Sequence, residues 1–300
     1  MNISPLQPFD SLSITTSLAA KLIAEQFPAW ADLPVRPVEF SGWDNRTFRL
    51  GETMLIRLPS AEHYAPQVHK EHQWLPYLAP CLPLPISTPL ALGHPSHDYP
   101  WHWSVYQWIE GESAANLSLD TLDLPLIASQ LAHFLRKLHA LPSTGGPTAG
   151  PHNFWRGGPL EIYDAETRSA LATLDGFIDT TAALSVWEEA LNSEWHTDPV
   201  WIHGDFSSGN FLVKNGTVAA IIDFGCMGIG DPACDLVLRW TFFQKEARQT
   251  FIRQVDLDKS TWSRARGWAL WKALITLVRL KGQNSPEISA HQHLINDIIS

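Results

Sequence analysis

A short hairpin pattern lies inside a half of the chain that is otherwise helical. Residues 200–225 read VWIHGDFSSGNFLVKNGTVAAIIDFG, which predicts a loop, a short strand, a turn at Asn215-Gly216 and a second short strand. The segments before and after it, such as SVWEEALNSEW and WTFFQKEARQTFIRQV, place apolar residues at helical spacing. The second half of the chain is therefore expected to fold as helices around one embedded hairpin.

The first third of the chain has a different character. Leu18, Leu22, Ile23 and Phe27 recur at helical intervals, and strand-like runs follow between about residues 35 and 58 and again in WHWSVYQWI. The chain then crosses over near residues 106–111. We therefore predict an α+β, bilobal fold with a small β-rich N-terminal lobe, 1–107, and a larger, mainly helical C-terminal lobe, 108–300.

Composition excludes several classes of protein. The chain has 300 residues, 45% of them hydrophobic, and a formal net charge of −10. A sizeable core can form, and the acidic balance argues against a nucleic-acid partner. The three cysteines form no CxxC pair, no signal-peptide pattern opens the chain, and no apolar run is long enough to span a membrane. These features predict a cytoplasmic protein with no membrane partner.

The chemistry is concentrated in His203-Gly204-Asp205, with Asn210 five residues after Asp205, and in Asp223-Phe224-Gly225. Phosphoryl transfer needs a group that orients the acceptor hydroxyl and hard oxygen ligands for Mg²⁺. One carboxylate followed by an amide and a second carboxylate, on either side of a hairpin, supplies both. Each motif alone could be a polar turn with a capping aspartate, but together, in this order and spacing, they are typical of a kinase centre.

The chain resembles the aminoglycoside phosphotransferase family of small-molecule kinases. HGDFSSGNFLV, AAIIDFG and GIGDPACDL look like the catalytic loop, the metal loop and the segment after it, and SGWDNRTFRL, KEHQWLPYLAP and LRKLHALP extend the likeness toward the N-terminus. The resemblance implies a protein-kinase-like fold with the nucleotide between two lobes. It makes Asp205 the catalytic base, Asn210 and Asp223 the Mg²⁺ ligands, and Asp235 a buried support of the catalytic loop.

The resemblance also assigns nucleotide contacts. Ser41 and Gly42 would lie in a turn over the phosphates, and the backbone of Gln107, Trp108 and Ile109 would meet the base. At the position where the family usually has a phosphate-pairing lysine this chain has Arg57, whose partner would be Glu71. As an alternative, these two residues are an ordinary strand-edge charge and a solvated helix residue.

The acceptor is the open part of the prediction. Ser207 stands where protein kinases have a lysine, and no APE-like segment follows the metal loop, so a small molecule is favoured over a protein. We expect transfer from ATP or GTP to a hydroxyl of an aminoglycoside-like acceptor. Kinases of macrolides, sugars or choline-type alcohols are alternatives, as is a non-catalytic pseudokinase.

The acceptor is expected between the catalytic loop and the C-terminal helices, near the loop 142–159. Four tryptophans could wall that pocket or simply fill a helical core. They are Trp240, Trp262, Trp268 and Trp271. Four carboxylates could meet a cationic acceptor or form a solvated helix face. They are Glu188, Glu189, Asp256 and Asp258.

Overall fold

The computed structural model describes residues 13–38, 42 and 44–300. These residues fall into two compact units. The first unit contains the residues up to Pro80 together with Ile86–Glu110, and the second unit contains Cys81–Pro85 and Gly111–Ser300. We describe each unit separately.

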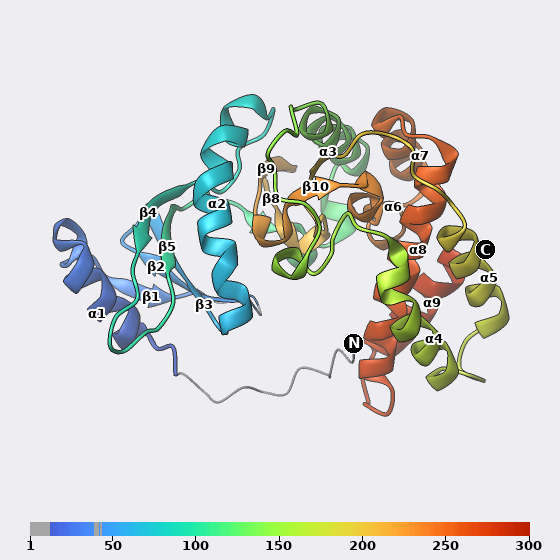
Figure 1. Ribbon diagram of the computed structural model, residues 1–300, viewed down its shortest axis with the longest axis horizontal. Coiled ribbons are helices and arrows are strands. Elements are labelled where there is room, and N and C mark those ends of the chain that lie inside the picture. The colour runs from blue at the N-terminus through green and yellow to red at the C-terminus, as the bar shows by residue number, and fades with distance from the viewer. Residues whose placement is uncertain (1–12, 39–41, 43) are drawn as a thin grey trace. The chain divides into compact units, whose positions relative to one another are not determined.

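The first unit is built on a mixed-order antiparallel sheet. Its strands are β1 (Val35–Pro37), β2 (Asn45–Leu50), β3 (Met54–Pro59), β4 (Pro89–Gly93) and β5 (Trp103–Gln107). Within the described residues the sheet has five strands in the order β1-β2-β3-β5-β4, with every neighbouring pair antiparallel (Figure 1). Because β3 lies in the interior of the sheet, Arg57 on β3 has a paired strand on each side. Gln107 is the last residue of β5.

In the described part of the first unit, two α-helices accompany the sheet. Helix α1 (Thr16–Gln26) begins at Thr15, whose hydroxyl accepts a hydrogen bond from the Leu18 amide, and it buries Leu22 and Ile23 in the same core as Ile56 of β3. This confirms the amphipathic N-terminal helix. Helix α2 (Ala65–Leu78) contacts β4 and β5, and it carries Glu71 on its buried face.

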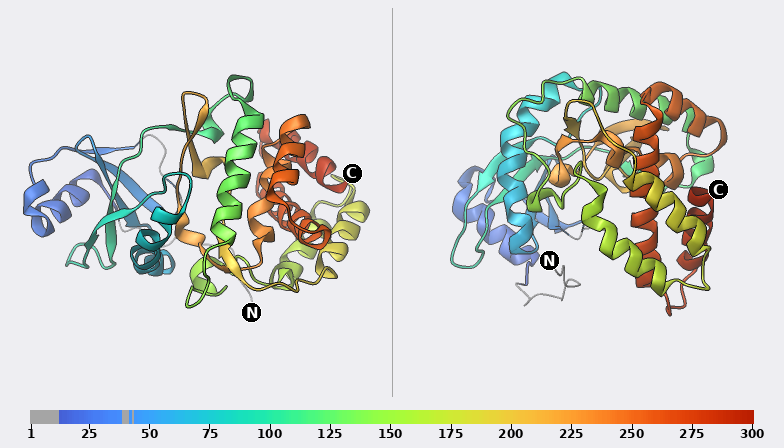
Figure 2. Two further views of the ribbon diagram at one scale, coloured as in Figure 1. Left: turned by 90° about the horizontal axis from the view of Figure 1, so that it is seen from above. Right: turned by 45° about the vertical axis from the view of Figure 1, so that its right-hand side comes forward.

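The second unit is mainly helical. Its helices are α3 (Leu124–His139), α4 (Asp164–Thr173), α5 (Thr180–Leu191), α6 (Leu238–Thr241), α7 (Lys245–Val255), α8 (Lys259–Leu280) and α9 (Glu287–Ile299). Helix α8 contacts α4, α5 and α9 (Figure 2), and it buries apolar residues over most of its length. A helix that packs against three others has to present apolar residues on several faces, which is consistent with the three tryptophans of α8.

The predicted hairpin lies inside this helical unit. Strand β8 (Phe211–Lys214) pairs with β9 (Thr217–Ile221), and the turn residues Asn215 and Gly216 both have positive φ angles, as a tight hairpin of this kind requires. Strand β6 (Glu112–Ser113) adds to β8, while β7 (Val200–Ile202) pairs with β10 (Gly228–Gly230). The predicted α+β fold class is confirmed.

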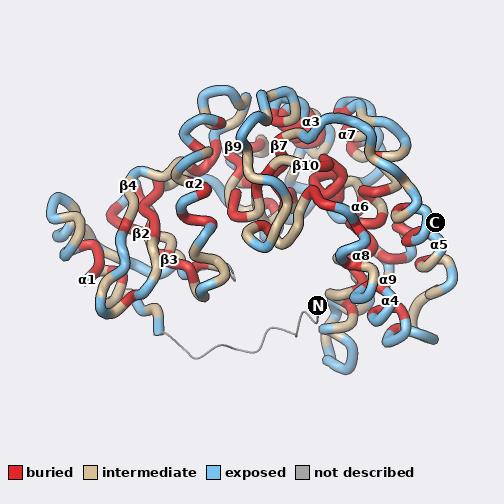
Figure 3. Tube along the Cα trace, viewed as in Figure 1, coloured by how far each residue is buried: buried red, intermediate tan, exposed pale blue. Residues whose placement is uncertain are grey.

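A buried segment follows the hairpin. The 3-10 turn Pro232–Leu236 and its flanking residues from 230 to 238 are all buried, and they are red beside α6 in Figure 3. This segment contains Asp231 and Asp235, so two carboxylates enter the core of the second unit.

Among the residues that the structure describes, no helix combines the length and hydropathy of a membrane span.

Candidate active site

The loop between β7 and β8 is held by the buried Asp235. Its two carboxylate oxygens accept hydrogen bonds from the backbone amides of His203 and Gly204, at 2.6 and 2.8 Å. Gly204 has a φ of +83°, and a Cβ at this position would lie 2.2 Å from the Cys226 carbonyl oxygen. The glycine is therefore required both by its backbone angle and by the close approach of the Cys226 backbone.

The environment of Asp235 affects its protonation. Burial disfavours the charged carboxylate, and although the two backbone amides and nearby His203 oppose this effect, the pKa of Asp235 rises to about 6. Asp235 does not itself line the pocket described below. It supports the catalytic loop from inside the core, as the sequence predicted.

His203 supports the same loop from its other side. Its ring is completely buried, and its Nε2 atom lies 2.9 Å from the carbonyl oxygen of Ile222, the residue before Asp223. The ring also packs against Phe224 with centroids 4.5 Å apart. His203 therefore ties the loop that carries Asp205 to the segment that carries Asp223.

Asp205 has a defined partner for each carboxylate oxygen. The Asn210 amide donates to Asp205 Oδ2 at 2.9 Å and to the Asp205 backbone carbonyl at 2.8 Å. The Lys272 ammonium donates to Oδ1 at 2.6 Å and forms an ion pair with it. Lys272 comes from α8, 67 residues further along the chain, and the sequence analysis gave it no role.

The ion pair sets the charge state of Asp205. Burial alone would favour the neutral acid, but the Lys272 ammonium together with the Arg156 guanidinium outweighs that effect and holds the pKa of the Asp205 carboxyl below its usual range. Asp205 is therefore an anion at neutral pH. An anionic carboxylate at this position is able to accept a proton.

Asn210 and Asp223 lie at adjacent ends of the hairpin. The Ile222 amide donates to the Asn210 carbonyl at 2.9 Å, which places the residue before Asp223 directly beside Asn210. Because the amide nitrogen of Asn210 is used by Asp205, its side-chain oxygen is the atom left for a cation. One amide oxygen and one carboxylate fit Mg²⁺, which binds few protein ligands and keeps waters and phosphate oxygens. Across the described ranges, no cluster of three His, Cys, Asp or Glu side chains offers an alternative metal site.

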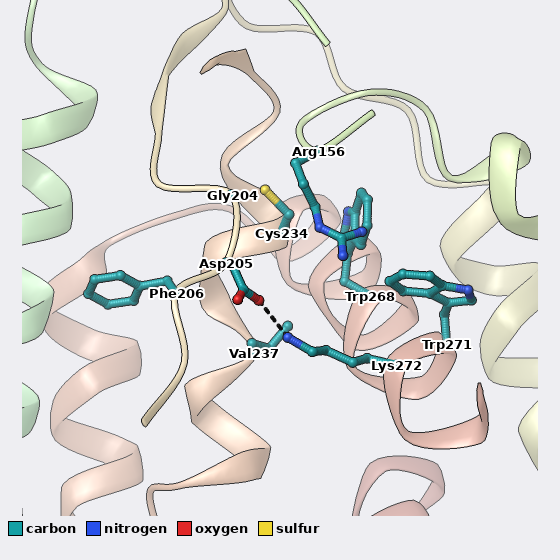
Figure 4. Close-up of a pocket in the computed structure, with 9 residues that line it drawn as sticks. All are labelled: Arg156, Gly204, Asp205, Phe206, Cys234, Val237, Trp268, Trp271 and Lys272. Carbon is teal, nitrogen blue, oxygen red and sulfur yellow. Dashed lines mark hydrogen bonds and ion pairs between the residues drawn. The ribbon is translucent and has the colours of Figure 1, made fainter. Parts of the chain in front are cut away.

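A small pocket opens beside Asp205 (Figure 4). It is lined by residues of the catalytic loop, the loop 142–159, the buried turn and α8, and it measures about 10 Å³, the room of about one water molecule. The lining residues are Arg156, Gly204, Asp205, Phe206, Cys234, Val237, Trp268, Trp271 and Lys272. It lies in the region where the sequence analysis expected the acceptor.

Two of the four C-terminal tryptophans line the pocket, and the other two pack elsewhere. Trp268 and Trp271 line the pocket, while Trp240 and Trp262 pack against each other and against Arg239 away from it. Of the carboxylates considered for a cationic acceptor, none lines the pocket: Asp258 caps α8, Glu188 pairs with Arg168, Glu189 accepts from Ser263, and Asp256 ends α7.

In the first unit, Arg57 and Glu71 form the predicted pair. The Arg57 guanidinium donates to Glu71 Oε1 at 3.3 Å, and only 13% and 5% of the two side chains is exposed. The Tyr106 hydroxyl donates to the other oxygen of Glu71. The surface-charge alternative is therefore wrong. Tyr106 was missed because a tyrosine inside an apolar strand carries no sequence signal beyond its contribution to the core.

The segment Gln107–Ile109 follows the last paired residue of β5. The Trp108 amide donates to the Thr53 carbonyl at 2.8 Å, so this donor is already used inside the sheet. Because hydrogen-bonding directions alternate along an antiparallel strand, the backbone groups of Gln107 point away from β3. Gly42 is exposed, and its carbonyl accepts from Arg46 at 3.2 Å; Ser41 lies outside the described residues.

A family model described as a phosphotransferase enzyme family matches residues 35–268. That match covers more than half of the chain. The chain belongs to this family. The resemblance drawn from the sequence motifs is thus confirmed.

The chain is also similar to a curated protein and to solved structures whose names identify them as phosphotransferases. An aminoglycoside 3'-phosphotransferase from Escherichia coli is 28% identical over 154 residues, which cover 47% of this chain and 49% of the relative. The chain therefore matches about half the length of that curated relative.

The solved structures of similar proteins extend over almost the whole chain. A GDP and kanamycin complex of APH(2″)-IIIa has a TM-score of 0.69 at 22% identity, covering 94% of this chain and 98% of that one. A macrolide 2'-phosphotransferase, MphH from Brachybacterium faecium, has a TM-score of 0.60 at 18% identity, with coverages of 95% and 97%. At these identities the likeness establishes the fold, which is the protein-kinase-like fold expected from the sequence.

Proposed function

We propose that this protein is a small-molecule kinase that transfers the γ-phosphoryl group of ATP or GTP to a hydroxyl group of a small organic molecule. The observation that carries the proposal is the arrangement of Asp205, an anionic carboxylate held by the Asn210 amide at 2.9 Å and bordering a pocket. Family membership supports the same chemistry.

In the proposed reaction Asp205 orients the acceptor hydroxyl and takes its proton. A bond forms between the acceptor oxygen and the γ-phosphorus, and the bond from that phosphorus to the bridging oxygen breaks. A nucleoside diphosphate leaves with that oxygen. The proton passes from Asp205 to solvent after the product departs, which restores the carboxylate.

Asn210, through its side-chain oxygen, and Asp223 would hold Mg²⁺. When bound, the cation would neutralise charge on the nucleotide phosphates. Asn210 would then serve two groups at once, because its amide nitrogen holds Asp205 while its oxygen faces the cation.

The first unit would bind the nucleotide. Arg57, fixed by Glu71, would pair with the phosphates, and the outward-facing backbone of Gln107 and Ile109 would meet the base. Gly42 and Ser41 would cover the phosphates. Solved relatives with GDP and with ATP bound support a nucleotide co-substrate. The division expected from the sequence, a nucleotide-binding lobe over 1–107 and an acceptor lobe over 108–300, belongs to the same proposal, with Ile109 contributing to the base site from just beyond that boundary.

Relatives whose names specify aminoglycosides or macrolides support a small-molecule acceptor. An aminoglycoside-like acceptor and another small alcohol are therefore both included in the proposal. The pseudokinase alternative is disfavoured, because Asp205, Asn210 and Asp223 are all present. A cytoplasmic location, suggested by the unpaired pattern of cysteines in the sequence, is part of the same proposal.

The test is a coupled assay of ADP and GDP release in the presence of Mg²⁺. The panel contains aminoglycosides, macrolides, sugars, choline-type alcohols and one basic protein, and phosphorylated products are identified by mass spectrometry. We expect stoichiometric transfer to at least one small alcohol. Transfer to the protein with none to any small alcohol would overturn the proposal.

A further inference from the structure

The pocket beside Asp205 has a charge opposite to that of the chain. The sequence carries a net charge of −10, yet the charged side chains that line the pocket are Arg156, Lys272 and Asp205. Two cations and one anion leave this pocket with a net positive charge. A local excess of positive charge in an acidic protein suggests that the pocket serves a ligand with negative charge.

Arg156 is the less satisfied of the two cations. Its guanidinium donates to the Tyr163 hydroxyl at 3.0 Å and lies over the rings of Trp271 and Trp268, at 4.8 and 5.3 Å from their centroids. Within the part of the chain that the structure describes, no carboxylate forms an ion pair with it, although the charge of nearby Asp205 contributes to raising the pKa of Arg156. A partly buried guanidinium with most of its five N–H donors unused is a ready site for a planar, bidentate anion.

The aromatic partners keep Arg156 in place without neutralising it. Tyr163 donates its own hydroxyl hydrogen to the Phe154 carbonyl, so its oxygen is able to accept from Arg156. Trp271 is fixed through its indole N–H, which donates to Glu166 at 2.8 Å. The guanidinium is therefore held in one orientation by stacking and one hydrogen bond, while its charge remains available to a ligand.

Lys272 is the second cation, and it has a different role. Its ammonium is paired with Asp205 at 2.6 Å, and 42% of its side chain is exposed, so it has room to move. While this ion pair persists, Lys272 occupies the space beside the oxygen that would accept the hydroxyl proton. A ligand that offers Lys272 another anion would release that oxygen for the reaction.

The donors that the pocket presents are both cationic. Trp268 lines it, but the indole N–H of Trp268 is a buried atom. The pocket thus presents a guanidinium and an ammonium, while its one anionic acceptor is Asp205. A polycationic ligand would meet two like charges here, and the carboxylates that could attract it lie elsewhere, in helix caps and surface pairs.

We propose that the acceptor is an alcohol that itself carries an anionic group, a carboxylate or a phosphate, and that Arg156 and Lys272 bind this group beside Asp205. The inference rests on the proposed kinase function and specifies its substrate class. Binding of the anion draws Lys272 away from Asp205, and the hydroxyl of the same molecule then takes the place of the ammonium.

The test compares acceptors that differ in one substituent. The first set is glucuronate, glucose and 6-amino-6-deoxyglucose, which share a ring and differ at carbon 6. The second set is 4-(hydroxymethyl)benzoate, 1,4-benzenedimethanol and 4-(hydroxymethyl)benzylamine. Binding without nucleotide is measured by calorimetry and by the ligand-induced shift in melting temperature, and transfer is measured with Mg²⁺ and ATP or GTP.

We expect the anionic member of at least one set to exceed its neutral and cationic partners by about tenfold or more in affinity and in kcat/KM. Arg156→Gln and Lys272→Met should reduce this preference to about one, and Lys272→Arg should retain most of it. Lys281→Met, which removes an exposed lysine at the end of the same helix, is the matched control and should leave the preference unchanged.

Two results would overturn the inference while leaving the kinase function intact. In the first, neutral or cationic members match or exceed the anionic ones in both sets. In the second, Arg156→Gln and Lys272→Met lower transfer to all members equally, which would mean that the two cations act on the transferred phosphoryl group and not on the acceptor. Absence of transfer to any alcohol, together with anion-selective binding, would instead count against the kinase proposal.

Discussion

Removal of the Arg264 side chain should destabilise the second unit more than removal of any exposed arginine. Arg264 of α8 binds Asp231 through two hydrogen bonds, from Nε to Oδ2 at 2.6 Å and from Nη2 to Oδ1 at 3.1 Å. The two side chains are only 6% and 7% exposed. Asp231 also caps the 3-10 turn that contains Asp235, since it accepts from the Ala233 amide at 3.1 Å.

The magnitude follows from the burial of the pair. Arg264→Met leaves the Asp231 carboxylate buried without its counter-ion, a change that costs about 3–5 kcal/mol in comparable buried pairs. For a protein of this size, about 2–4 °C of melting temperature is lost per kcal/mol, so we expect a fall of roughly 6–20 °C. Turnover should fall as well, because the turn that Asp231 caps places Asp235 under the catalytic loop.

The assay is urea and thermal denaturation followed by circular dichroism. Arg168→Met is the matched control, because Arg168 also binds an aspartate, Asp164, through two bonds but with 44% and 34% of the side chains exposed. It should lose less than about 1 kcal/mol. Equal losses in Arg168→Met and Arg264→Met would refute the reasoning, and Asp231→Asn combined with Arg264→Met should be less unstable than the sum of the single changes.

Three further predictions follow from the site and its surroundings. Arg57→Ala should raise the nucleotide KM and Arg57→Lys should recover only part of it, because the bidentate geometry is lost; steady-state kinetics would detect this, with the exposed Arg36→Ala as a control expected to change nothing. Asp223→Ala should weaken Mg²⁺-dependent nucleotide binding more than Asn210→Ala does, since an anion holds a hard cation better than an amide, and calorimetry with and without Mg²⁺ would reveal the reverse order if the ligand assignment is wrong. Burial lowers the pKa of His139 from 6.5 to about 4, so protonation of the unfolded chain should remove up to about 3 kcal/mol of stability as the pH falls from 6.5 to 4. His139→Leu should lack that loss in urea titrations at pH 7 and pH 5, and an unchanged pH dependence would contradict the assignment.

Local patterns predicted the parts of the structure that depend on neighbouring residues. The Asn215-Gly216 turn was predictable because few residues tolerate two positive φ angles in succession. The pairing of Arg57 with Glu71 was predictable because the family motif specifies a cation on a strand and a carboxylate on the next helix. The turn prediction uses two adjacent residues, and the ion-pair prediction uses two positions that are 14 residues apart but belong to one motif.

The pocket could not be predicted in the same way. Lys272 reaches Asp205 from a helix 67 residues away, and in the sequence it interrupts an apolar run without indicating a partner. Arg156 lies in an irregular loop, where a lone arginine is ordinarily solvated. The sequence did contain one signal for Lys272. It is a single cation within an apolar stretch of a helix, one residue after Trp271 and four after Trp268.

The most direct test of the proposed function is the rate of phosphoryl transfer in Asp205→Asn. The variant should keep its fold and its nucleotide affinity, because Asn is nearly the same size and Asp235 holds the loop from beneath, but it should lose at least about 100-fold in kcat since it can no longer accept the hydroxyl proton. Asp179→Asn, which keeps its capping role at the start of α5, is the control and should retain wild-type kcat. Single-turnover transfer from γ-labelled nucleotide to an alcohol measures both. A large loss confined to Asp205→Asn is the result that we predict, whereas full transfer in that variant would contradict the assignment of Asp205 as the base.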